Sequence, residues 1–423
     1  MTDPDHRADD GPNEDGAPDR DVEVRDVLPR DAIPSVDDPA FVADYGGPAG
    51  DDVVVVERGD EARAYPVRYL HYHEIVNDEV AGDPLAVTWC PLCGSAVVYD
   101  RRVVVDRAAV DDSARTESGA TGGDAADATG AAGDDSAGDD GPDERVLEFG
   151  VSGRLADDDL VMYDRETGSE WKQSLGVAID GPLAGTELTA LPAGLTSWAS
   201  FRDAHPDGVV LAPPGGASEA ASDDDEPAPV DYDADPYEAY FDAAGFGLDA
   251  HRGDGPGRGW DRDDVAPKEP VLGVTVDDEA VGFPRSVVDD AGGTVAATVG
   301  DRGVLVVLGE ALHAYDYPGF EFDVHRVHGR SDVDRVHGRS DRDGEDVADT
   351  ERERGKRDDE EGQPGVRPGG TERVLRGDGT RWDPATGRSA DGRRLDRLPA
   401  RRLFAFAWQD DHGPDSFYGL PDA

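Results

Sequence analysis

The sequence has few cysteines, few lysines and no long hydrophobic run. Its only two cysteines, Cys90 and Cys93, stand three positions apart, which excludes a small fold held together by several disulfides. No stretch approaches the ~18 apolar residues of a membrane-spanning helix. The first 20 residues have neither an apolar core nor a basic leader. We therefore expect a soluble, cytoplasmic protein with no membrane partner.

Positive charge is also scarce. The chain has 41 basic residues against 95 acidic ones, which gives a formal net charge of −54. Nucleic-acid partners call for clustered basic residues, so we expect none here. Such a negative chain repels itself, and concentrated counterions relieve that repulsion. Adaptation to high salt is the plainest explanation, and the acidity then says little about a substrate.

Large apolar residues are unevenly distributed. Hydrophobic residues make up 37% of the chain, with 53 glycines and 30 prolines, so some tracts cannot bury enough apolar surface to fold. Four tracts of acidic and small residues predict a disordered tail at 1–20, disordered insertions at 106–144 and 323–370, and a linker at 213–230.

Short apolar runs separated by glycine-containing turns dominate the remaining sequence. Residues 53–57 and the run that begins at Ala62 flank a turn at Gly59, the pattern of a β-hairpin. Residues 85–89 and 96–99 read as two further strands around the cysteine motif. We therefore predict a β-rich α+β fold of short strands and hairpins with few short helices.

The second half of the chain resembles a worn copy of the first. Tyr65-Pro66 returns as Phe283-Pro284, 218 residues later, and two further motif pairs show offsets of 216 and 219. We expect two pseudo-repeated halves, at 21–212 and 231–423. The second half is degenerate, because 305–308 is a plain apolar run where the cysteine motif should recur. Any thiol chemistry then belongs to the first half.

The Cys-x-x-Cys motif at Cys90 and Cys93 allows three interpretations. In a redox site one thiolate attacks a disulfide and the other resolves the mixed disulfide. In a zinc site, Cys-Pro-x-Cys-Gly resembles one knuckle, although such sites normally use two. In a structural role, two small buried residues close a tight turn. The spacing alone leaves all three open.

Two histidines lie close to the motif in sequence. His71 and His73 would face the same side if their segment were a strand, and Glu74 follows them. A nearby imidazole can lower a thiol pKa, move a proton or bind a metal. His73 is therefore the candidate third site residue, as a proton-transfer group or a metal ligand, and His71 is a weaker one.

The order of these motifs resembles the domain of unknown function 3179 family. The resemblance rests on His73-Glu74-Ile75-Val76-Asn77-Asp78, Thr88-Trp89-Cys90-Pro91-Leu92-Cys93-Gly94-Ser95 and Asp159-Leu160-Val161-Met162-Tyr163-Asp164-Arg165. No activity comes with the family name. Some members are labelled as selenoproteins, and selenocysteine in place of cysteine implies redox use of that position. The resemblance therefore favours thiol chemistry at Cys90 and Cys93, with His73 and Glu74 as neighbours.

The leading hypothesis from the sequence is a thiol-dependent redox protein with an unidentified redox partner or substrate. Cys90 and Cys93 would cycle between dithiol and disulfide, and His73 would assist proton transfer. The alternative is a protein that binds zinc or copper through Cys90, Cys93 and His73. A third class is a non-catalytic scaffold whose cysteines only build a turn.

Overall fold

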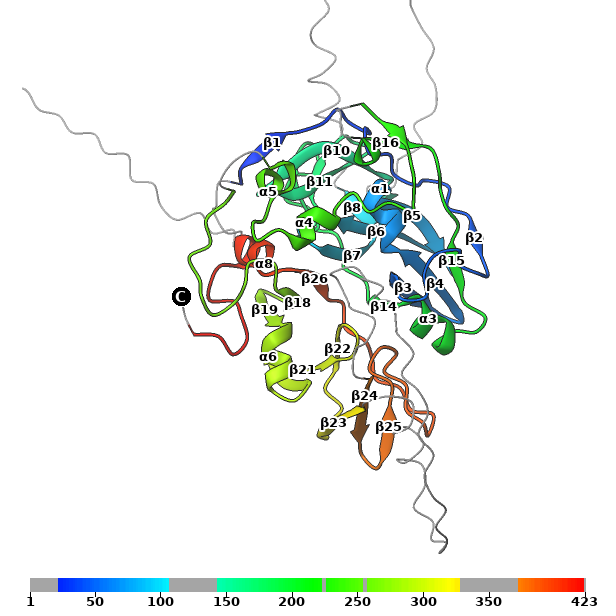
Figure 1. Ribbon diagram of the computed structural model, residues 1–423, viewed down its shortest axis with the longest axis vertical. Coiled ribbons are helices and arrows are strands. Elements are labelled where there is room, and N and C mark those ends of the chain that lie inside the picture. Colours follow the sequence, from blue (N-terminus) through cyan, green and yellow to red (C-terminus); the bar gives the residue numbers. More distant parts are fainter. Residues whose placement is uncertain (1–21, 106–142, 223–225, 254–256, 328–371, 422–423) are drawn as a thin grey trace, which may run out of the picture.

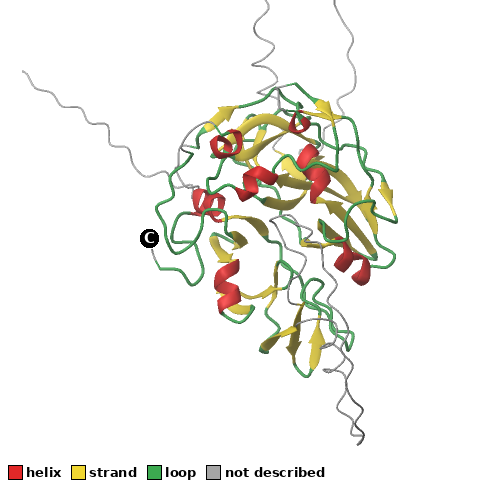
Figure 2. Cartoon of the chain, in the orientation of Figure 1, coloured by secondary structure: helices red, strands yellow, loops and turns green. Residues whose placement is uncertain are grey.

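The computed structural model describes residues 22–105, 143–222, 226–253, 257–327 and 372–421. Strands predominate over six short α-helices in these residues (Figure 2), so the β-rich α+β class is confirmed. The tail expected at 1–20 and most of the insertions expected at 106–144 and 323–370 lie outside the described residues. None of the described helices is long and apolar enough to cross a membrane.

The first half opens with a hairpin and a short helix. Strands β3 (Asp52–Arg58) and β4 (Glu61–Pro66) pair antiparallel around Gly59, which has a positive φ of 56°. That left-handed conformation suits glycine and closes the turn. Helix α1 (Val67–His73) follows Pro66 directly. Because the proline ring fixes its φ near the helical value, the chain enters α1 without a loop.

Three antiparallel strands follow α1 and form a meander. They are β5 (Ile75–Val80), β6 (Asp83–Cys90) and β7 (Ser95–Asp100). Seven of the eight β6 residues are buried, as expected of a strand with protein on both faces. The cysteine motif therefore joins two buried neighbouring strands.

The second half repeats this succession of elements. Strands β18 (Pro270–Val276) and β19 (Glu279–Pro284) form a hairpin, then come helix α6 (Arg285–Asp290) and the meander β20 (Thr294–Val299), β21 (Arg302–Leu308) and β22 (Leu312–Asp316). The sequence of buried and exposed positions along β18 and β19 is the same as along β3 and β4. This recurrence is what two pseudo-repeated halves require.

Each half also closes with a strand and a helix. In the first half, β14 (Gly194–Ser197) pairs with β3 and leads into α3 (Trp198–Ala204). In the second, β26 (Arg401–Phe404) pairs with β18 and leads into α8 (Ala405–His412). From here on, "first half" means β3 to α3 and "second half" means β18 to α8.

One sheet crosses from one half into the other. Its strand order is β19-β18-β26-β7-β6-β5, so β26 of the second half pairs with β7 of the first (Figure 1). Cys90 and Cys93 belong to a hydrophobic cluster that also includes Phe406 and Trp408 of α8. The cysteine motif is thus covered by residues from both halves.

The remaining elements complete smaller sheets around these two units. The strands are β1 (Val24–Asp26), β2 (Phe41–Val42), β8 (Arg102–Val105), β9 (Asp143–Val146), β10 (Phe149–Ala156), β11 (Asp159–Asp164), β12 (Glu170–Lys172), β13 (Val177–Asp180), β15 (Val209–Leu211), β16 (Ala217–Ser218), β17 (Ala228–Pro229), β23 (Phe322–Val327), β24 (Glu372–Gly377) and β25 (Thr380–Trp382). The helices are α4 (Glu238–Asp242), α5 (Leu248–Arg252) and the 3-10 turn η2 (Glu219–Ala221). The segment 213–230, expected as a linker, contains β16, η2 and β17.

Candidate functional site

The cysteine motif forms a tight turn between β6 and β7. Cys90 ends β6, and the Gly94 N–H donates to the Pro91 carbonyl across 3.3 Å. Gly94 has a φ of +55°, and a Cβ there would lie 2.7 Å from the Phe404 ring. Both facts require glycine. The Phe404 N–H also donates to the Cys93 carbonyl across 2.7 Å, so β26 holds the turn in place.

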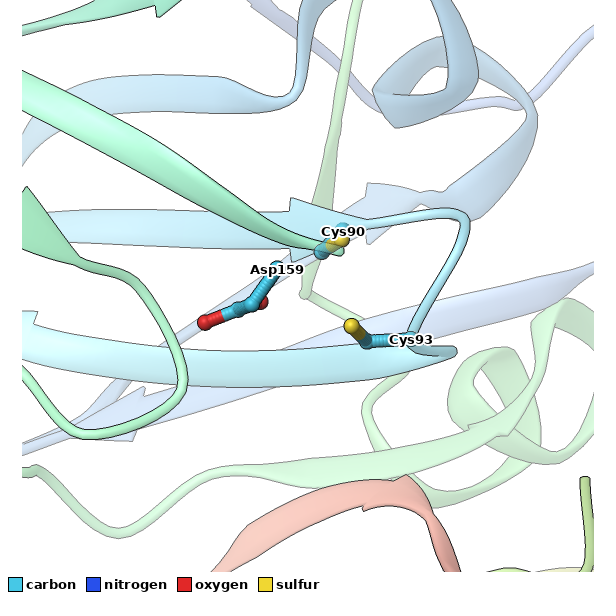
Figure 3. Close-up of side chains that lie close together, drawn as sticks. All are labelled: Cys90, Cys93 and Asp159. Atoms are coloured by element: carbon cyan, nitrogen blue, oxygen red, sulfur yellow. The ribbon is translucent and has the colours of Figure 1, made fainter. Parts of the chain in front are cut away.

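The turn brings both thiols to a carboxylate from a distant strand. The sulfurs of Cys90 and Cys93 and a carboxylate oxygen of Asp159 all lie within 4.8 Å of one another. Figure 3 shows the Cys93 side chain directed toward the other two from the opposite side of the turn. All three residues are at most 2% exposed. Asp159 begins β11, so the cluster joins parts of the chain that lie 66 residues apart or more in sequence.

The surroundings hold both thiols in their protonated form. Burial raises the pKa of Cys90 and raises that of Cys93 well above the ordinary thiol value, and the negative charge of Asp159 adds to both effects. Burial and a neighbouring negative charge both disfavour a thiolate, because neither supplies a positive charge to stabilise it. Without a cation, this pair is a poor source of nucleophilic thiolate.

Asp159 is itself held by a buried charge network. The Ser174 N–H donates to its Oδ2 across 2.8 Å, whereas Oδ1 has no hydrogen-bond partner among the described residues. Burial, with the charge of Asp411, raises the pKa of Asp159 to about 6 although Lys172 opposes them. Lys172 Nζ lies 2.9 Å from a carboxylate oxygen of Asp411. The free Oδ1 leaves Asp159 able to bind one more group.

A second acidic group faces Cys90 across a small cavity. Glu74 and Cys90 both line this cavity of about 80 Å³, together with Tyr237 and His251. Glu74 ends α1 with a positive φ of 57°, unusual for a residue other than glycine. Burial raises its pKa to about 8. Its carboxyl group is therefore mostly protonated at neutral pH, and it can exchange a proton near that pH.

The structure does not bring His73 to the thiols. Its Nδ1 lies 2.9 Å from the Pro34 carbonyl and its Nε2 lies 2.7 Å from the Tyr232 hydroxyl. Both ring nitrogens are thus engaged, and the cluster of possible ligands contains Asp159 instead. The physical reason is that residues 67–73 form a helix and not a strand, so the alternation that would put His71 and His73 on one side does not apply.

His71 lies in a different environment from His73. Its Nδ1 lies 3.2 Å from an Asp235 carboxylate oxygen, and its ring lines a larger cavity with Trp89. Trp89 precedes Cys90 on β6, and successive strand residues point to opposite faces. His71 therefore belongs to the face of the sheet opposite the thiols.

Sequence reasoning missed Asp159 and Lys172 as site residues. Asp159 stands in a run with Asp157 and Asp158, in a chain where acidic residues are everywhere. One signal could have singled it out: it directly precedes the apolar run 160–163, so it begins a buried strand. Lys172 is one of only three lysines in the chain, and that rarity was a usable signal as well.

The donor set of this cluster fits a transition-metal ion. Two thiolates and one carboxylate are ligands that Zn²⁺ accepts, whereas Cu⁺ prefers soft sulfur donors alone. A bound cation would also supply the positive charge that the thiols and Asp159 lack. The same two thiols could instead form a disulfide, because they lie on one turn and are free.

Comparison with known proteins gives a family but no close relative. Neither curated proteins nor solved structures gave a match. The family model described as "Protein of unknown function (DUF3179)" matches residues 30–416, which is most of the chain and includes both halves. The chain therefore belongs to the DUF3179 family.

Proposed function

We propose that this protein binds a zinc-type divalent metal ion through Cys90, Cys93 and Asp159. The observation that carries the proposal is the mutual approach of the three ligand atoms to within 4.8 Å in a buried site. The turn also has the features of a zinc knuckle, with Pro91 between the cysteines and Gly94 in a left-handed conformation after them.

The electrostatics support the metal over free thiols. Burial and the negative charge of Asp159 raise the pKa of both thiols, so the thiols of the metal-free site keep their protons at neutral pH, whereas Asp159, with a pKa of about 6, is largely ionised. A divalent ion displaces thiol protons because the ligands bind it only when deprotonated. We expect metal uptake to release protons and to weaken steeply as the pH falls.

The site also has room for a further ligand. Three protein ligands leave one position of a tetrahedral ion open, as in catalytic zinc sites. Cys90 lines the 80 Å³ cavity with Glu74, so water or a small molecule would reach the ion from that side. Glu74, with a pKa of about 8, would exchange protons with that ligand.

Elemental analysis of protein purified without chelator tests the proposal. We expect about one zinc per chain, which Cys90→Ser and Asp159→Asn each reduce severalfold. His73→Gln is the matched control, because the sequence suggested His73 as a ligand and the geometry does not; this variant should keep the metal. Metal content that depends on His73 but not on Asp159 would contradict the assignment.

Cobalt substitution gives a second readout that does not depend on activity. Cobalt bound by Cys90 and Cys93 should show a thiolate charge-transfer absorption in the near ultraviolet, and Asp159→Asn should alter its visible bands. Absence of the thiolate band in refolded, cobalt-loaded protein would remove the proposal.

A dithiol redox function is the second candidate, favoured by the unequal surroundings of the two sulfurs. Cys90 borders the cavity with Glu74, whereas Cys93 is enclosed and does not line it. In that reading the Cys90 thiolate attacks a small disulfide and releases one thiolate. Cys93 then attacks the Cys90 sulfur, releasing the second thiolate and leaving the internal disulfide.

Thiol counting on the same preparation separates the two functions. If the protein is a redox protein, an excess of small disulfide should convert both thiols to one internal disulfide, and a dithiol reductant should reverse this. If the site holds zinc, the thiols should resist oxidation until a chelator removes the ion.

A further inference from the structure

A second, larger cavity lies between the two halves, across β6 from the thiol cluster. Its volume is about 250 Å³. Trp89 lines it, whereas the next residue, Cys90, lines the smaller cavity beside the thiols. Because successive strand residues face opposite sides, β6 separates the two cavities. The larger cavity is therefore distinct from the proposed metal site.

Aromatic and aliphatic side chains form much of its wall. Trp89, Phe241 and Phe404 line it, with Leu195 and Leu403 beside them. A concave pocket with an apolar lining and a few converging polar groups is the usual form of a small-molecule site. This wall suits an apolar or aromatic body.

Three cations line the same cavity without a salt bridge to an acidic residue in the described parts of the chain. Among the described residues, no carboxylate oxygen lies within 4.0 Å of the charged groups of Lys268, Arg285 and Arg402. Arg285 donates to the Glu310 carbonyl across 2.9 Å, and Arg402 donates to the Leu312 carbonyl across 2.6 Å. The three N–H groups of the Lys268 ammonium are all taken by the backbone carbonyls of residues 240, 241 and 243. Such a gathering is notable in a chain with a net charge of −54.

Most acidic groups in the wall are already engaged. Asp51 accepts two hydrogen bonds from Arg68, of 2.6 and 2.9 Å. Glu310 accepts several at the start of α3. Asp52 is left: burial raises its pKa to about 6 while the charges of Arg402 and Arg285 oppose that rise, so at neutral pH Asp52 is largely ionised and offsets part of their charge. Arg285 and Arg402 therefore keep N–H groups for an external anion, whereas Lys268 contributes its charge alone.

Two residues that line this cavity each have a buried ring nitrogen without a partner. Nε2 of His71 and Nε1 of Trp89 have no hydrogen-bond partner in the part of the chain that the structure describes, and both residues are 7% exposed and line the cavity. Asp235 holds the other nitrogen of His71. Buried polar atoms normally have partners, so these two atoms point to a ligand.

The three cations stand at related positions of the repeat. All three come from the second half or from the residues just before it. At the corresponding position of the first half, each has an uncharged residue that also lines the cavity. Gly50 and Lys268 each lie two residues before the first hairpin strand of their half, β3 and β18. Val67 and Arg285 each follow the hairpin proline directly. Leu195 and Arg402 are each the second residue of the closing strand, β14 and β26. The cavity thus lies where equivalent parts of the halves meet, and only one side supplies the unpaired charge.

We propose that this cavity binds a small organic anion with an apolar body. Its carboxylate or phosphate group would accept hydrogen bonds from Arg285 and Arg402, and the positive charge of Lys268 would add to the attraction. Its body would pack against Trp89, Phe241 and Phe404, and a polar atom would meet the free nitrogen of His71. The proposal is independent of the metal at Cys90 and Cys93.

Calorimetric titration of the full chain with 3-phenylpropanoate, at one fixed salt concentration, tests the proposal. We expect this anion to bind at least about tenfold more tightly than 3-phenylpropan-1-ol, which has the same ring and no charge. Arg285→Gln should weaken binding about tenfold, and Arg285→Lys should weaken it less. Equal affinity for the acid and the alcohol would overturn the proposal.

Two controls keep the test interpretable. Arg302→Gln removes the same charge from an exposed pair with Asp316, outside the cavity lining, and should leave the affinity unchanged. Cys90→Ser should also leave it unchanged, so that failure of the metal proposal and failure of this one remain distinguishable. If Arg302→Gln weakens binding as much as Arg285→Gln, the anion responds to overall charge and the cavity assignment is refuted.

Discussion

The two halves have the same succession of elements and carry different side chains at corresponding positions. In the first half, β6 and β7 are joined by the turn that contains Cys93, and Cys90 pairs with Ser95 at its base. In the second, Leu308 pairs with Leu312 at the corresponding place, and the turn between them is shorter and has no thiol. The second half instead supplies Arg285 and Arg402 to the larger cavity. The fold constrains the strands, whereas a few turn and edge positions decide the chemistry.

The halves also differ in how their closing helices pack. Phe201 of α3 packs on Val55 and Ala64 of the first hairpin. In the second half, Gly273 and Gly282 lie against Trp408 of α8, and a Cβ at either would come within 2.4 Å of its ring. A larger helix side chain is thus matched by smaller hairpin residues.

The largest expected effect comes from the ion pair that joins the halves. Lys172 of β12 and Asp411 of α8 lie 2.9 Å apart, with side chains 2% and 1% exposed. Lys172→Met would leave a buried carboxylate without its partner, and we expect it to lower the free energy of unfolding by about 3–5 kcal/mol. Urea denaturation measures this. Adding Asp411→Leu should recover part of the loss; no recovery would mean that the charge is not the cause.

A smaller effect is expected when the second hairpin is made to resemble the first. Gly273→Val introduces the residue found at Val55 and places it against Trp408. We expect overpacking to cost about 2–3 kcal/mol. The double variant Gly273→Val, Trp408→Phe copies the pairing of the first half and should be more stable than Gly273→Val alone. Thermal unfolding of the single and double variants measures this difference. If the double variant loses as much stability as the two single variants together, the two packings are not equivalent.

A pH dependence should belong to the first half alone. Glu74 is the C-cap residue that follows α1, whereas Ala291 is the C-cap residue that follows α6. The folded-state pKa of Glu74 is raised to about 8, so its stabilising contribution is complete below pH 4.5 and is lost as the pH rises toward 8. Between pH 6.5 and 8, above the titration of Asp52 and Asp159, metal-free protein should lose roughly 1.5 kcal/mol.

Glu74→Gln is the variant that tests this pH dependence. An amide has no proton to lose, so denaturation midpoints of the variant should stay nearly constant over that range. A midpoint that still falls as in the wild type would assign the titration to another group.

The smallest effect should come from an exposed ion pair of the second half. Arg302 contacts Asp316 at 2.5 Å with 46% of its side chain exposed. Because solvent screens such a pair, Arg302→Gln should change the free energy of unfolding by less than about 1 kcal/mol. A loss as large as that of Lys172→Met would show that burial does not govern the strength of these pairs.

Local patterns in the sequence predicted the scaffold well. The valines at 53–56, the turn at Gly59 and the recurrence of Tyr65-Pro66 as Phe283-Pro284 all report interactions between near neighbours, and the hairpins follow from them. The thiol turn between two strands was predictable for the same reason.

The rest of the site depends on long-range packing. Asp159 reaches the thiols because the start of β11, which follows Cys93 by 66 residues in sequence, lies beside the turn. Nothing local distinguishes it from its acidic neighbours. His73 seemed near the thiols in sequence, yet its last-turn position on α1 directs it to Pro34 and Tyr232. Distance along the chain is a poor guide where a helix intervenes.

The match of Val67 with Arg285 and of Leu195 with Arg402 has a consequence for binding direction. If two identical chains met around a twofold axis, each position would carry the same residue on both sides, and a ligand could sit equally well in two reversed orientations. Two copies within one chain are free of that restriction. The unpaired cations occupy one side of the cavity only, so an asymmetric molecule would be held in a single orientation.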